Sequence, residues 1–174
     1  MFKNNMLTSS KENILYNNIL SLSRNKVFYT KFLLSDTFQN RINLIFIHIS
    51  FLFIKIKQNT NNNIYKDFYQ NIFDIIFQQI ESNMREIGYG DVMVNKKMKL
   101  LIKSFYNILL YCESFDYKEV KSNNLFFSNY LEKNKKQKMA NNEDLINYFR
   151  KFQLFCFDLN ADSVLKGEIN FNYK

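Results

Sequence analysis

Apolar residues recur at intervals of three and four along most of this chain of 174 residues. That spacing places them on one side of an α-helix, and no segment shows the sustained alternation that indicates a β-strand. Proline, which interrupts helices, is absent, and glycine occurs only three times. We therefore predict an all-α fold, a single domain of about six packed helices.

The predicted helices begin where polar residues can cap them. Ser10 precedes the first helix, and Asp36 or Thr37 precedes the second, which ends near Gln58. The remaining ranges are 63–87, 94–114, 117–132 and 143–157, and the first runs over 11–23. In the helix over 63–87 we expect one buried stripe, composed of Ile64, Phe68, Ile72, Ile75, Ile76, Ile80, Met84 and Ile87.

The most apolar run of the chain, residues 42–54, lies between Arg41 and Lys55. It is shorter than the roughly 20 residues that a membrane-spanning helix needs, so we interpret it as a buried core helix. The chain's single histidine, His48, lies within it. A histidine in such a helix is more often a buried structural residue than a general base, and we expect that here.

The sequence offers no positive indication of an enzyme, a metal site or a cofactor site. No cluster of Cys and His has metal-ligand spacing. Cys112 and Cys156 are far apart in apolar surroundings, which favours buried free thiols in a reducing compartment. The first 18 residues lack the features of a signal peptide and of a transit peptide, so we expect no export.

The formal net charge of +8 favours anionic partners such as nucleic acid, a ribosome, anionic lipid or an acidic protein. Lys96, Lys99 and Lys103 recur at helical spacing, with Lys97 nearby, and predict one exposed basic edge. Sequence-specific nucleic-acid binding is not expected, because the chain has no known binding motif and only four arginines. A compositional preference for lysine is the alternative explanation.

The stretch "MREIGYGDV", residues 84–92, contains two of the three glycines. We predict that Gly88 closes the preceding helix with a positive φ, that Gly90 and Asp91 form the turn, and that Asp91 or Asn95 caps the next helix. Arg85 is expected to bind Asp91 or an acid on a neighbouring helix. A phosphate-binding loop is disfavoured, because such loops follow a strand. Packing and partner recognition both remain open, and a fully buried Tyr89 would exclude recognition.

Around this stretch the sequence resembles the ubiquinol–cytochrome c chaperone family. The matching features are Met84, Arg85, Glu86, Ile87, Gly88, Tyr89, Gly90, Asp91, Lys96, Lys97, Met98, Lys99, Phe105 and Tyr106. A second match upstream comprises Phe28, Tyr29, Asp36, Thr37, Arg41, Ile47 and His48. The chain departs from the family pattern at Asn40, Ile42 and Asn43, where glycine, an aromatic residue and an acid are usual.

The resemblance implies a helical, non-enzymatic assembly factor for the respiratory cytochrome bc complex (complex III). It implies residues 28–170 as the chaperone-like domain, preceded by an N-terminal helix and lead-in over 1–27. The expected client is newly made cytochrome b. Further expected partners are the ribosome exit region, the inner-membrane surface and a small partner protein.

The expected location is peripheral, at the cytoplasmic face of the inner membrane in a bacterium or the matrix side in a mitochondrion. The partner-binding residues that we expect are Arg85, Glu86, Gly88, Tyr89, Gly90, Asp91, Lys96, Lys97, Lys99 and Lys103. A basic helical protein that binds ribosomes or nucleic acid without a specific client remains the alternative.

Overall fold

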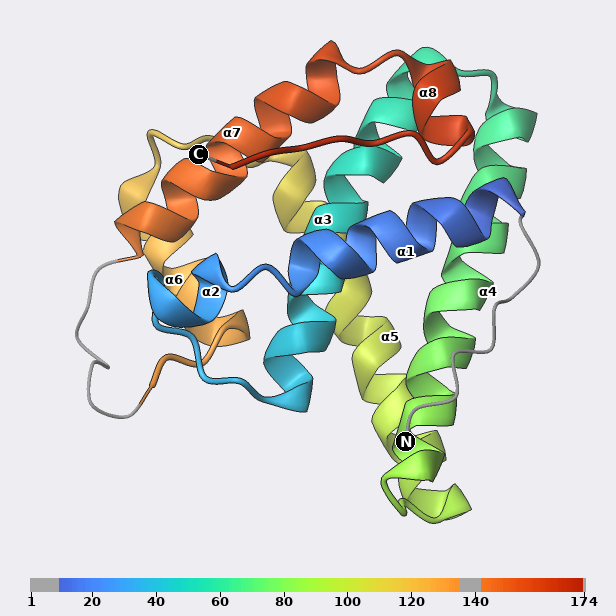
Figure 1. The fold of residues 1–174 in the computed structure, drawn as a ribbon, viewed down its shortest axis with the longest axis vertical. Coiled ribbons are helices and arrows are strands. Elements are labelled where there is room, and N and C mark those ends of the chain that lie inside the picture. The colour runs from blue at the N-terminus through green and yellow to red at the C-terminus, as the bar shows by residue number, and fades with distance from the viewer. Residues whose placement is uncertain (1–9, 135–141, 174) are drawn as a thin grey trace.

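The computed structural model describes residues 10–134 and 142–173 (Figure 1). These residues form six helices of eleven residues or more and two short ones, and they contain no strand beyond one isolated bridge between Leu34 and Lys133. The helices are α1 (Lys11–Ser23), α2 (Val27–Thr30), α3 (Phe38–Asn59), α4 (Asn62–Glu86), α5 (Asp91–Glu113), α6 (Val120–Tyr130), α7 (Glu143–Asp158) and α8 (Ala161–Leu165). The prediction of a single all-α domain with about six packed helices is confirmed.

Helix α3 is the centre of the fold. It contacts α1, α4, α5, α7 and α8, and its side chains are buried from Ile42 to Ile56. A helix buried on every side must be apolar all round, which explains why the run over 42–54 contains so few polar residues. Within the described residues, no helix is long and apolar enough to cross a membrane.

His48 is fully buried in α3, as predicted. Its Nδ1 lies 2.6 Å from the carbonyl oxygen of Leu44, and its Nε2 lies 2.8 Å from the hydroxyl of Tyr148 on α7. The ring therefore donates to Leu44 through Nδ1 and accepts from Tyr148 at Nε2. Burial lowers the pKa of His48 to about 4, so the ring is neutral and joins two helices.

Two helices have the side-chain N-caps that were predicted from the sequence. Ser10 caps α1, and Thr37, rather than Asp36, caps α3 by accepting from the backbone N–H of Asn40. The prediction for α5 is wrong: neither Asp91 nor Asn95 caps it. The N-cap is Gly90, and α5 begins three residues earlier than expected, because Asp91 already has helical geometry.

Helices α4 and α5 are antiparallel to each other. The turn that connects them projects from the body of the molecule, at the bottom of Figure 1. Phe73 and Phe77 of α4 contact Phe105 of α5 with ring centroids 5.8 and 5.9 Å apart. These aromatic contacts join the two helices. The lysine-rich segment 135–141, between α6 and α7, lies outside the described residues.

Candidate functional site

The turn between α4 and α5 is built on Gly88, whose φ is +97°. The N–H of Tyr89 donates to the carbonyl of Met84 at 3.1 Å, and the N–H of Gly88 donates to that of Arg85 at 3.0 Å. This pair of bonds closes α4 with a Schellman motif, which requires a left-handed residue where Gly88 lies. The predicted positive φ is confirmed, and it fixes how the chain leaves α4.

Arg85 ties the two sides of this turn together. Its Nη2 donates to Glu81 at 2.8 Å, one helical turn earlier, and its Nη1 donates to Asp91 at the start of α5. The predicted ion pair with Asp91 is therefore confirmed, and Glu81 is a second partner. One guanidinium thus holds the last turn of α4 to the first turn of α5, which orients the residues between them.

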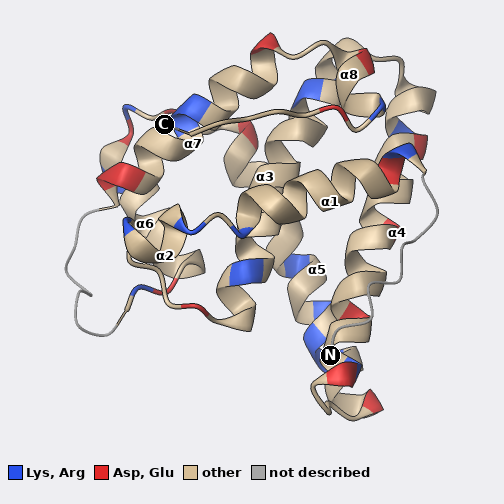
Figure 2. Cartoon of the chain, viewed as in Figure 1, with Lys and Arg blue, Asp and Glu red and all other residues tan. Residues whose placement is uncertain are grey.

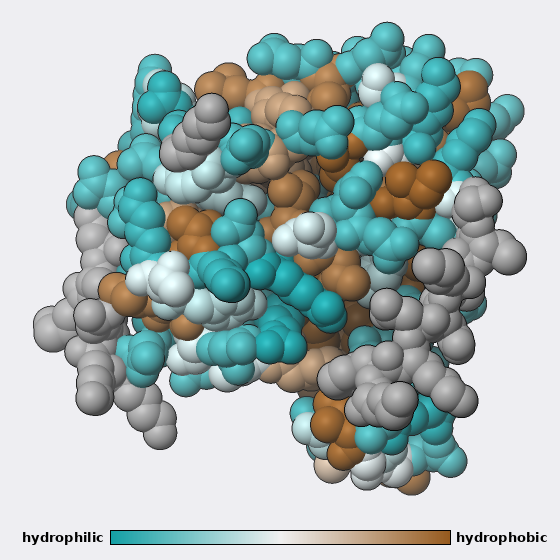
Figure 3. Space-filling model, in the orientation of Figure 1, coloured by the Kyte–Doolittle hydropathy of each residue, from teal (hydrophilic) through white to brown (hydrophobic). Residues whose placement is uncertain are grey.

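Large apolar side chains are exposed around this turn. Val92 is 86% exposed, Ile87 is 61% exposed, and Met93 is also exposed. Apolar surface at the projecting end is visible in Figure 3. Ile87 was predicted on the buried stripe of α4, and that prediction is wrong, as it is for Ile64. The periodicity is correct, but both residues lie at the ends of α4, where nothing among the described residues covers them.

Tyr89 is 38% exposed, so the fully buried position that would have excluded recognition is not found. The Nζ of Lys97 lies over the Tyr89 ring, 5.0 Å from its centroid. The Lys97 cation above the ring holds the Tyr89 side chain against α5, and the exposed part of Tyr89 remains accessible to a partner. Glu86 is exposed beside it.

The basic edge is also present. Lys96, Lys99 and Lys103 are exposed on α5, and Lys97 is half-buried beside Tyr89. None of Lys96, Lys99 and Lys103 is in an ion pair with another described residue. Figure 2 shows these blue segments on α5, approaching the turn. Sequence reasoning missed that Val92, Leu100 and Leu110 share this exposed side, although they recur at helical spacing with the lysines.

Neither the backbone conformation nor the packing of the described residues requires a glycine at position 90. The φ of −71° at Gly90 suits any residue, and apart from its two chain neighbours a Cβ added there meets no atom of a described residue within 4 Å. The other two glycines differ, because Gly88 and Gly167 both have positive φ, and a Cβ on Gly167 would lie 2.8 Å from α1 backbone atoms. The chain also places Ser10, Thr37, Asn61 and Asn160 as side-chain caps on other helices. Gly90 therefore leaves open space at the start of α5.

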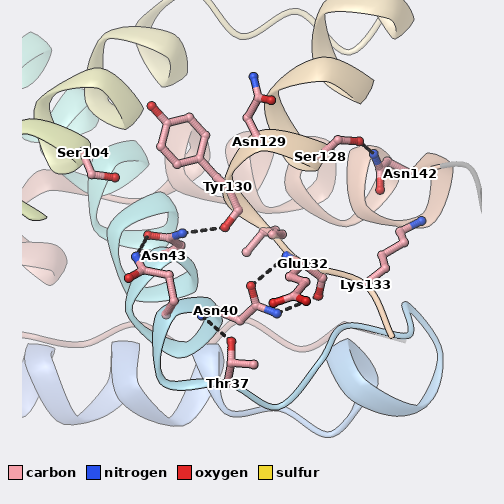
Figure 4. A pocket seen from close by; sticks show the side chains of 12 residues that line it. Thr37, Asn40, Asn43, Ser104, Ser128, Asn129, Tyr130, Glu132, Lys133 and Asn142 are labelled. Atoms are coloured by element: carbon pink, nitrogen blue, oxygen red, sulfur yellow. Dashed lines mark hydrogen bonds between the residues drawn. The ribbon is translucent and has the colours of Figure 1, made fainter. Parts of the chain in front are cut away.

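A hollow of about 570 Å³ lies between the start of α3 and the chain around the end of α6 (Figure 4). Asn40 donates to the carbonyls of Ser35 and Glu132, both at 2.7 Å, and accepts from the N–H of Glu132 at 2.8 Å. Asn43 donates to the carbonyl of Tyr130. The two asparagines that depart from the family pattern thus attach the segment after α6 to α3, which is a structural role.

The upstream motif also has a structural explanation. Arg41 binds Asp36 through two hydrogen bonds, of 2.7 and 2.8 Å, and so braces the loop before α3. This hydrogen bond from Arg41 lowers the pKa of Asp36. Cys112 and Cys156 are buried free thiols, as predicted, and burial raises the pKa of both. A high thiol pKa makes a poor nucleophile.

The comparisons with known proteins concern nearly the whole chain. The fold is similar to the crystal structure of the Cbp3 homolog from Brucella abortus, with a TM-score of 0.77 and 22% sequence identity, over 94% of this chain and 89% of that one. A search of curated proteins gave no match. The profile of the ubiquinol-cytochrome C chaperone family matches residues 30–171. That match covers well over half of the sequence, and the chain therefore belongs to the ubiquinol-cytochrome C chaperone family.

Proposed function

We propose that this protein is a non-enzymatic chaperone that binds newly made cytochrome b during assembly of the cytochrome bc complex, and that the α4–α5 turn contacts this client. Family membership supports the class of function. The buried high-pKa thiols and the neutral, fully paired His48 agree with a binding protein. Client binding needs an accessible surface with apolar side chains, which the turn provides.

The observation that carries the proposal is the open space at Gly90. A glycine whose side-chain position is empty, and whose backbone needs no glycine, allows another chain to approach closely. Around it, Ile87, Val92 and Met93 are exposed in a turn that Arg85 holds in one shape. Preorganisation of this kind lowers the entropic cost of binding. Exposed apolar groups in a fixed turn suit an apolar segment of a membrane protein.

The proposed place of action is the inner face of the inner membrane, close to where cytochrome b is made. Lys96, Lys99 and Lys103, which form no ion pair with another described residue, support a location near an anionic surface, whether membrane or ribosome exit region. The competing function, a basic protein that binds ribosomes or RNA without a client, rests on the same lysines.

Affinity purification of the tagged full chain from solubilised membranes tests the proposal. We expect cytochrome b to copurify with the unaltered protein and to be lost with Tyr89→Ala or Gly90→Ser, while both variants stay folded and monodisperse. Leu125→Ala on α6, also an exposed apolar residue, is the matched control and should retain the client. Recovery of bulk RNA without cytochrome b would overturn the proposal in favour of the competing function.

A further inference from the structure

The solvent-exposed side of α5 extends well beyond the α4–α5 turn, where we propose that the client binds. We define the α5 face by its exposed residues on that side: Val92, Lys96, Lys99, Leu100, Lys103, Asn107 and Leu110. Their spacing of three, four and seven keeps them on one side of the helix. From Val92 to Leu110 the face extends about 27 Å along the axis.

No acidic residue belongs to the α5 face. The two acids of α5, Asp91 and Glu113, lie at its ends, and each is in an ion pair, with Arg85 and Lys57 respectively. The acidic residues of this hairpin are carried mainly by α4, as the red segments of Figure 2 show. The charge of the α5 face is therefore positive, and its three lysines are in no ion pair with another described residue.

The same face exposes large aliphatic side chains. Leu100 is 61% exposed and Leu110 is 63% exposed, in addition to Val92. Tyr106 lies exposed at the edge, with its ring 6.4 Å from that of Phe73 on α4. Lysines interleaved with leucines, and a tyrosine at the edge, form the pattern of a helix lying in a membrane interface.

An anionic bilayer fits this pattern better than RNA does. Phosphate groups would satisfy the three lysines in both cases. RNA, however, has no apolar region for Leu100 and Leu110, and the α5 face has no arginine and no ring for base stacking at its centre. A lipid headgroup layer offers phosphates directly above acyl chains, so both kinds of side chain find partners.

We propose that the α5 face docks flat on an anionic lipid bilayer. The ammonium groups of Lys96, Lys99 and Lys103 lie at the phosphates, and Leu100 and Leu110 enter the boundary between headgroups and acyl chains. This orientation keeps the α4–α5 turn next to the bilayer surface, where a membrane client emerges. The docking does not depend on the client contact at Gly90, and either proposal can fail alone.

Flotation with vesicles, using the purified full chain, tests the docking. We expect binding to phosphatidylcholine vesicles that contain phosphatidylglycerol, little binding to phosphatidylcholine alone, and weaker binding as salt is raised. Lys96→Glu/Lys99→Glu/Lys103→Glu should lower the partition coefficient by about a hundredfold or more. The matched control, Lys66→Glu/Lys121→Glu/Lys166→Glu, changes the net charge equally at exposed lysines outside α5 and should lower the partition coefficient far less.

A second pair of variants separates bilayer docking from general electrostatic attraction. Leu100→Asn/Leu110→Asn should weaken vesicle binding, although it leaves the charge of the protein unchanged. Leu125→Asn/Leu154→Asn, on α6 and α7, should leave vesicle binding unchanged. Equal losses in the two lysine variants, or in the two leucine variants, would overturn the proposal. So would tight binding of an RNA oligonucleotide that depends on the three α5 lysines, with no binding to anionic vesicles.

Discussion

The guanidinium of Arg85 reaches across the α4–α5 turn to the carboxylate of Asp91, and both residues are exposed. An exposed ion pair contributes little to the stability of a fold. Its effect here is local, because it joins the end of one long helix to the start of the next. The residues between them, including Tyr89 and Gly90, are thereby held in one arrangement.

Asp91→Asn should therefore change the melting temperature very little and weaken client capture clearly. The loss of charge frees Arg85 from α5, while its bond to Glu81 remains. Differential scanning fluorimetry and copurification of cytochrome b measure the two effects. Asp36→Asn, which removes the other exposed arginine pair, with Arg41, is the control and should leave capture unchanged. A much lower melting temperature of Asp91→Asn would show that the Arg85–Asp91 ion pair stabilises the fold as a whole.

Gly88 and Gly90 should respond in opposite ways to substitution. Gly88→Ala places a side chain at a φ of +97°, which costs about 1 kcal/mol and lowers the melting temperature by about 3 °C. Gly90→Ser should leave stability unchanged or slightly higher, because serine is at least as good an N-cap as glycine. Chemical denaturation of the two variants distinguishes them. Equal destabilisation would mean that Gly90 has a packing role after all.

The stability of the protein should fall in mild acid because of His48. Its folded-state pKa of about 4 lies below the ordinary value of 6.5, so the unfolded chain takes up a proton first as the pH falls. The contribution of the neutral, buried His48 to the free energy of unfolding is fully present above pH 6.5. It is lost as the pH falls from 6.5 to about 4, a change of about 3 kcal/mol. Urea titrations at several pH values measure it. His48→Gln should be less stable at neutral pH but show a flatter pH dependence over this range.

Asn40 should be sensitive to substitution although it lies beside a hollow. Asn40→Ala removes the side chain that donates to Ser35 and Glu132 and accepts from Glu132, and we expect a cost of about 2 kcal/mol. Asn129→Ala, an exposed residue of the same hollow, should cost less than about 0.5 kcal/mol. Urea denaturation checks both. Similar values for the two would remove Asn40 from the account of the fold.

Much of this structure could be predicted because its information is local. Helical periodicity and capping residues depend on neighbours within four positions, and Thr37 and Gly88 follow from such rules. The burial of His48 follows from the apolar run around it. The positive φ at Gly88 could be predicted from the end of a periodic apolar stripe and the glycine that follows it.

Other features could not be predicted because they depend on distant parts of the chain. Asn40 meets Glu132 across 92 positions, and His48 meets Tyr148 across 100. The exposure of Ile87 depends on how far α4 and α5 extend beyond α3. The open space that the described residues leave around a Cβ at Gly90 is likewise a property of the whole fold, so the sequence alone could not separate packing from recognition.

Site-specific photocrosslinking tests the central claim most directly. A photoreactive phenylalanine analogue replaces Tyr89 in one variant and Leu125 on α6 in another, and both are expressed in cells that make cytochrome b. We expect a crosslink to cytochrome b from position 89 and none from position 125. Crosslinking from position 125 alone, with cytochrome b still copurifying with both variants, would contradict the claim that the α4–α5 turn contacts the client.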